Sequence, residues 1–129
     1  MRIDRLELEG FRNYIQETAV FDPRCNVVCG ENAQGKTNLL ESLVYLSRGK
    51  SPRARTDREM IGFEREFARV TAAVESRERE FRVQADLFRG RRRKITVNQV
   101  PIKNFWQRTG CTNGSMNCSW WRWGRQCRK

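Results

Sequence analysis

The hydrophobic pattern alternates along the amino-terminal part of the chain. Between residues 3 and 11, apolar positions interleave with charged ones, which predicts a half-buried strand. Residues 18–21 form a second short β-favouring run, which can pair with the first as a hairpin after a turn at Asn13-Tyr14. Residues 26–29 form a short, largely apolar run that directly precedes a glycine, so they predict a short, fully buried strand.

A helical period replaces this alternation further along the chain. Apolar residues recur at helical spacing from Leu39 to Leu46, and Gly49 stands where the residue after a helix end belongs. The pattern predicts a helix from about Lys36 to Arg48. An exposed basic loop is expected over residues 49–56, followed by a short helix that Asp57 would cap and that would end at Met60.

The next segments return to an alternating pattern. They predict four strands, at residues 68–75, 81–88, 95–97 and 100–102. Turns are expected at residues 76–80 and at Asn98-Gln99. We therefore expect residues 1–105 to form one lobe that contains both a helix and antiparallel strands.

The candidate chemistry lies between the expected buried strand and the expected helix. The sequence there matches the phosphate-binding pattern GxxxxGK[ST], and we expect the whole motif to form a nucleotide site: Gly30, Glu31, Asn32, Ala33, Gln34, Gly35, Lys36 and Thr37. Its glycines let backbone N–H groups converge on a phosphate, and the amino end of the helix adds its dipole. Lys36 is expected to reach the β- and γ-phosphates of ATP, and the Thr37 hydroxyl to bind Mg²⁺.

Nucleotide binding does not by itself imply hydrolysis. Hydrolysis needs a carboxylate at the end of another strand to complete the metal site. No apolar run here ends in Asp-Glu, and Asp86 lies inside an expected strand, so we assign no catalytic residue. Enzymatic activity stays open. The chain has no histidine, which excludes Ser-His and Cys-His nucleophilic catalysis.

Charge points to a phosphate-rich partner. Lys and Arg number 26 against 15 Asp and Glu, a net charge of +11, which favours nucleic acid; the alternative is that the charge serves solubility. The basic run at residues 89–94 fits a contact to a DNA backbone or a solvated turn equally, and Lys50, Arg53 and Arg55 have the same two interpretations. No apolar run could span a bilayer or serve as a signal peptide, so a cytoplasmic location is expected.

Residues 106–129 differ in composition from everything before them. All four tryptophans and three of the five cysteines lie there, without one acidic residue. We expect a disordered or non-native tail; the alternative is a platform of tryptophans that stack on bases. The cysteines have an odd count and no CxxC spacing, so neither a disulfide framework nor a zinc site is expected.

Several separated blocks of the sequence resemble the RecF family of SMC-like, ABC-type ATPases. They are MRIDRLELEGFRNY, NVVCGENAQGKTNLLESLVYLSRGKS, DREMIGFEREFARV and GRRRKITVNQVPI, and together they cover roughly residues 1–102. The resemblance implies an α/β P-loop NTPase fold, an ABC/SMC-like ATPase head with an antiparallel β-subdomain. It also implies an ATP-dependent homodimer that binds single-stranded or gapped DNA in recombinational repair, replication and the SOS response, with mediator partners of the RecO and RecR type.

The resemblance also extends the expected site. The family's phosphate-binding residues carry over onto the motif, with Asn38 as a further candidate, and Arg12 and Asn13 match the FRN block near the nucleotide in SMC-like heads. The Walker B aspartate, the signature segment and the arm domain of the family have no counterpart here, so a fragment or frameshifted product is expected. Two alternatives stay open: another P-loop phosphotransferase or kinase, and a non-functional fragment.

Overall fold

The computed structural model describes residues 2–30, 35–76 and 79–102. The elements of this part of the chain are β1 (Arg2–Phe11), β2 (Tyr14–Val20), α1 (Lys36–Arg48), the 3₁₀ helix η1 (Asp57–Met60), β3 (Phe67–Ser76), β4 (Arg79–Phe88), β5 (Lys94–Val97) and β6 (Val100–Pro101). The bounds of α1 agree with those expected from the helical spacing, and every strand expected after α1 is present.

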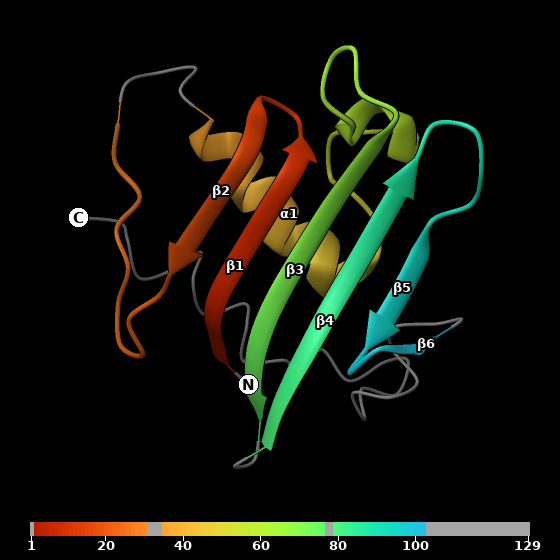
Figure 1. Cartoon of the computed structure of the whole chain (residues 1–129). Helices are drawn as coiled ribbons and strands as arrows, with labels where there is room; N and C mark the ends of the chain where they lie inside the picture. The colour runs from red at the N-terminus through yellow and green to blue at the C-terminus, as the bar shows by residue number, and fades with distance from the viewer. Residues whose placement is uncertain (1, 31–34, 77–78, 103–129) are drawn as a thin grey trace.

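The strands form one antiparallel sheet with the order β2-β1-β3-β4-β5-β6. Figure 1 shows α1 crossing one face of this sheet, behind β1, β3 and β4 in that view. Because side chains alternate across a strand, β1, β3 and β4 turn their apolar sets toward the helix. The pairing of Leu8 with Val70, and of Val70 with Ala85, places these three side chains on that same face.

The core lies between α1 and this face of the sheet. Its buried strand residues include Leu6, Leu8, Val70 and Leu87, each at most 2% exposed. From α1 the buried residues are Glu41, Ser42, Tyr45 and Leu46. The helix therefore buries a carboxylate and a hydroxyl beside its apolar residues, whereas Leu40 is 43% exposed.

The expectation of a buried strand at residues 26–29 is wrong. No strand is assigned there, and Val27 is 81% exposed. A short apolar run becomes a buried strand only where neighbouring strands supply its hydrogen bonds and other elements cover its faces. None of the described strands pairs with this segment, and β2, the edge strand nearest to it in sequence, pairs only with β1.

Three smaller expectations also need correction. Thr56 caps η1, not Asp57, through a capping box with Glu59. The first hairpin turns at Arg12 and Asn13, because β2 already begins at the following tyrosine. The turn expected over residues 76–80 is shorter, because Ser76 pairs with Arg79. The expected turn between β5 and β6 is confirmed, with positive φ at both of its central residues.

Some expectations lie outside the described residues. They are the central motif residues Glu31, Asn32, Ala33 and Gln34, and the tail over 106–129. Among the helices that the structure describes, none combines the length and the apolar character needed to span a membrane.

Candidate nucleotide-binding site

Gly35 ends the phosphate-binding motif's loop and starts α1. Its φ of 94° is in the region that glycine favours, and an added Cβ would lie 2.8 Å from the Tyr14 hydroxyl and 2.9 Å from the Asn13 side-chain nitrogen. The Tyr14 hydroxyl also donates to the Gly35 carbonyl oxygen at 3.1 Å. The hairpin turn therefore packs directly against the start of the helix, and only glycine fits there.

The amino end of α1 has features that favour the binding of an anion. Within the described residues, no side chain caps the helix at Gly35, and its first turn holds no acidic residue. The first N–H groups of a helix need acceptors, and a phosphate supplies them. Lys36 is half-buried and its ammonium group donates to the carbonyl oxygen of Gly30, so it reaches back across the loop. Thr37 is exposed. These residues fit a magnesium-bound triphosphate.

A buried carboxylate lies one turn further along the helix. Glu41 is 2% exposed and accepts two hydrogen bonds from Arg12, from Nε at 2.9 Å and from Nη2 at 2.8 Å. The Ser51 hydroxyl donates to the same carboxylate, and the Arg53 guanidinium lies 3.6 Å away. Burial raises the pKa of Glu41, but the hydrogen bonds from Arg12 and Ser51 and the two positive charges outweigh it and hold that pKa below its ordinary value.

Side-chain amides connect this cluster to the motif. Asn38, which follows the motif's threonine, donates to the Asn13 side-chain oxygen at 2.8 Å and accepts from Arg53 at 3.0 Å. Three segments far apart in sequence are thus joined: the β1–β2 turn, the first turns of α1 and the loop after α1. The resemblance-based candidates Arg12, Asn13 and Asn38 lie together in this network.

An open groove of about 710 Å³ lies beside the network. It is lined by Arg12, Asn13, Asn38, Arg53, Thr56, Arg58, Glu59, Ile61, Phe63 and Arg89. Four arginines against one glutamate make the groove positive, which suits an anionic ligand. Phe63 is 89% exposed and contributes an aromatic ring to it.

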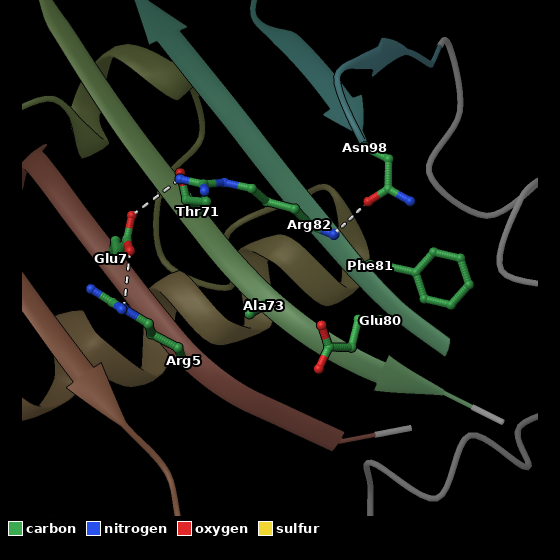
Figure 2. Close-up of a pocket in the computed structure, with 8 residues that line it drawn as sticks. All are labelled: Arg5, Glu7, Thr71, Ala73, Glu80, Phe81, Arg82 and Asn98. Carbon is green, nitrogen blue, oxygen red and sulfur yellow. Dashed lines mark hydrogen bonds and ion pairs between the residues drawn. The ribbon is translucent and has the colours of Figure 1, made fainter. Parts of the chain in front are cut away.

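The opposite face of the sheet is polar and holds a second depression. It has a volume of about 400 Å³ and is lined by Arg5, Glu7, Thr71, Ala73, Glu80, Phe81, Arg82 and Asn98. Figure 2 shows Arg5, Glu7 and Arg82 on the side of the sheet away from α1, where Glu7 pairs with Arg5 at 3.0 Å and with Arg82 at 3.4 Å. Its two arginines and two glutamates largely neutralise one another, so it offers less positive charge to a phosphate than the groove beside α1 does.

Asp86 also lies on that polar face. It is 7% exposed, pairs with the Arg69 Nε at 2.7 Å and accepts from the Gln84 side chain. The ion pair with Arg69 is a sufficient reason for an acidic residue at this position of the strand.

The basic run at residues 89–94 divides into two groups. Arg89 donates to the carbonyl oxygens of Arg65 and Gly62, and Arg93 bridges the Tyr45 hydroxyl at 3.3 Å and the Asp57 carboxylate at 3.2 Å. These two arginines hold the fold together. Arg91, Arg92 and Lys94 are exposed, and the Arg91 guanidinium lies 3.7 Å over the Phe88 ring. Arg91, Arg92 and Lys94 are therefore the cations of this run that can contact a phosphate backbone without giving up a described hydrogen bond or ion pair.

Sequence reasoning missed Glu41 and Ser51 and gave Arg53 only a general basic role. The available signal was an acid within the helical pattern, four residues before Tyr45, at a spacing that places both on one side of a helix. The partners of Glu41 come from loops, and loop positions follow no period.

Known proteins are similar to this chain in both sequence and fold. A family model described as AAA domain matches residues 5–115. The DNA replication and repair protein RecF of Shouchella clausii is 47% identical over 98 residues, which is 74% of this chain and 26% of that protein. The solved recombination mediator protein RecF-ATP of the RecFOR pathway has a TM-score of 0.76 at 28% identity, over 82% of this chain and 30% of that chain.

The SMC head domain from Thermotoga maritima has a TM-score of 0.68 at 24% identity, over 83% of this chain and 40% of that chain, and shows the fold alone. The expected fold class, an α/β P-loop ATPase head with an antiparallel β-subdomain, is confirmed. The resemblance to RecF is confirmed as well, although this chain spans less than a third of the RecF proteins it matches. The chain therefore belongs to the AAA domain family, and its sequence is similar to the amino-terminal part of RecF.

Proposed function

We propose that this chain binds ATP together with Mg²⁺ in the manner of a RecF-like repair protein. The observation that carries the proposal is the amino end of α1, where no side chain of the described residues forms a cap, Gly35 packs against Tyr14 and Lys36 reaches back to Gly30. The N–H groups of a helix's first turn, an ammonium group and a hydroxyl oxygen at the start of one helix are the groups that bind a triphosphate and its metal. The similarity to the RecF-ATP structure supports the same choice of ligand.

Each motif residue has a defined role in this proposal. Lys36 neutralises the β- and γ-phosphates, and the Thr37 hydroxyl is a ligand of Mg²⁺. Gly30 and Gly35 let the chain turn around the phosphates. The backbone N–H groups of Glu31, Asn32, Ala33 and Gln34 would donate to the β-phosphate. The arginine-lined groove beside α1 adds positive charge that attracts the nucleotide.

Calorimetric titration of the full chain with MgATP tests the proposal. Lys36→Ala is expected to weaken binding at least about 100-fold, because it removes a charge-assisted contact to two phosphates. Lys50→Ala is the matched control, since Lys50 is an exposed lysine of the loop after α1 and lies outside the motif. Equal MgATP affinity of Lys36→Ala and the unsubstituted chain would overturn the proposal.

We further propose that the chain belongs to a DNA-binding repair protein that works in the cytoplasm. The net charge of +11 and the exposed cations of the β4–β5 loop support binding to single-stranded or gapped DNA. The similarity to a recombination mediator supports a role in recombinational repair, replication and the SOS response. An ATP-dependent homodimer and mediator partners of the RecO and RecR type are part of this proposal for the longer protein.

A further inference from the structure

The single negative charge of Glu41 is in contact with two positively charged side chains. Its side chain is fully buried, and it receives a bidentate pair from Arg12 and a second guanidinium, that of Arg53, at 3.6 Å. One carboxylate offsets one of these two charges. The surplus charge therefore belongs to two arginines that both line the groove beside α1, whereas Glu41 itself does not line it.

Arg12 and Arg53 differ in how strongly their contacts with Glu41 fix the side chain. Arg12 is 21% exposed and is fixed by two short hydrogen bonds in the fork geometry that orients a guanidinium. Arg53 is 48% exposed, has the longer contact to Glu41 and also donates to Asn38. The carboxylate thus fixes the direction of one guanidinium and keeps the second beside it, although two free guanidinium groups would repel each other.

This arrangement stands directly against the phosphate-binding motif. Asn38 follows Thr37 in the first turn of α1, and it joins Arg53 on one side to Asn13 on the other. A phosphate at the amino end of α1 would therefore meet a groove wall whose positive groups are already oriented. Orientation before binding removes the entropy cost of ordering long side chains at the moment of binding.

We propose that Glu41 is a positioning residue for nucleotide binding, which holds Arg12 and Arg53 in the groove wall so that their guanidinium groups face the phosphates. The inference rests on the proposed function, because it concerns the same nucleotide site. Glu41 acts only through the arginines and does not touch the nucleotide. Because Glu41 is buried on the core side of α1, it can hold the two arginines without occupying the groove itself.

Glu41→Gln tests this role, because it keeps the size of the side chain and removes its charge. We expect an MgATP affinity roughly tenfold lower, the size of one missing charge-assisted hydrogen bond. The freed Arg12 regains its rotamers and is repelled by Arg53. The entropy cost of ordering Arg12 again on binding outweighs the gain in net positive charge, because water in the open groove screens attraction and repulsion alike. Unchanged or tighter binding overturns the inference.

Asp86→Asn is the matched control. Asp86 is also a buried carboxylate paired with an arginine, but it lies on the opposite face of the sheet. Both variants are expected to lower the melting temperature of the full chain, and only Glu41→Gln to lower its MgATP affinity. An equal loss of affinity in both variants would show that Glu41 has only a structural role.

Non-additivity separates positioning from general destabilisation. In a chain that already carries Arg12→Ala and Arg53→Ala, the added Glu41→Gln is expected to leave the MgATP affinity within about twofold, because nothing remains to be positioned. A further tenfold loss in that background overturns the inference.

If Glu41→Gln does not fold, Arg12→Lys is the variant to use in its place. Arg12→Lys keeps the positive charge beside Glu41 but loses the fork geometry of the guanidinium, and it should weaken MgATP binding severalfold. Unchanged affinity of Arg12→Lys is then the overturning result.

The outcomes also separate this inference from the proposed function. If MgATP binds and Lys36→Ala abolishes binding while Glu41→Gln does not change it, the nucleotide site stands and the role of Glu41 falls. If the unsubstituted chain binds no MgATP, both fall together.

Discussion

The hydroxyl of Tyr14 donates a hydrogen bond to the carbonyl oxygen of Gly35 at 3.1 Å. This contact joins the first residue of β2 to the residue that precedes α1, and so connects the sheet to the phosphate-binding motif. Burial raises the pKa of Tyr14 and the charge of Glu17 raises it further, so the phenol keeps its proton at neutral pH and serves as a donor. The position of the motif's last glycine thus depends on the hairpin.

Tyr14→Phe should loosen this connection without leaving a cavity. We expect the free energy of unfolding to fall by about 0.5–1.5 kcal/mol, the usual net value of one hydrogen bond, and MgATP affinity to fall a few-fold. Urea unfolding and calorimetric titration measure the two effects. Tyr45→Phe is the control: Tyr45 packs in the core and its hydroxyl contacts Arg93, so this variant should lose stability alone. A parallel fall in MgATP affinity in both variants would contradict the assignment.

Gly35→Ala should be far more damaging than its size suggests. The φ of 94° is strained for any side chain, and the new Cβ would lie within 2.9 Å of both Asn13 and Tyr14 atoms. We expect a loss of about 1–3 kcal/mol in the free energy of unfolding and no detectable MgATP binding. Gly90→Ala should change neither, because nothing lies within 4 Å of the Cβ it would add. Circular dichroism during heating, followed by titration, distinguishes the two.

Alkaline pH should destabilise the chain through Tyr45. Burial, followed by the charge of Asp57, raises the pKa of Tyr45 from 10.0 to about 12, although Arg93 partly opposes this. The folded state thus holds a proton that the unfolded chain releases above pH 10.0, so the contribution to stability is complete below that pH and is lost as pH rises to about 12.

The expected loss is on the order of 1–2 kcal/mol in the free energy of unfolding. Urea unfolding from about pH 9 to about pH 12 measures it, and Tyr45→Phe should flatten this part of the pH dependence. An unchanged slope in the variant would show that other groups cause the alkaline loss.

The sequence predicted those elements whose period and boundaries are both local. The helix from Lys36 to Arg48 has its spacing and its terminal glycine within the segment, and the strands after it alternate clearly. The failure at residues 26–29 has a different origin. Apolar content indicates that the segment can be buried, but pairing depends on strands elsewhere in the chain. Val27, at 81% exposed, is the consequence.

The candidate site divides in the same way. The motif residues are contiguous, so the pattern alone was enough to propose Gly30, Lys36 and Thr37 as site residues. The ion pair between Arg12 and Glu41 joins residues that are 29 positions apart, and Ser51 approaches from a loop. Neither contact follows from a period or from spacing, because each depends on how the hairpin turn packs on the helix.

The exposed cations of the β4–β5 loop lead to the last prediction. Arg91→Ala with Arg92→Ala should weaken binding of single-stranded DNA at low salt. The slope of log affinity against log salt should fall by about 0.7 for each phosphate that the protein no longer neutralises. Stability should hardly change, because both side chains are exposed.

Arg93→Ala is the contrasting variant. It removes the bridge between Tyr45 and Asp57, so it should lower the melting temperature with a smaller effect on the salt slope. Fluorescence anisotropy with a labelled oligonucleotide at several salt concentrations measures the slope. If the double variant keeps the slope of the unsubstituted chain, this loop is a solvated turn and the DNA contact lies elsewhere.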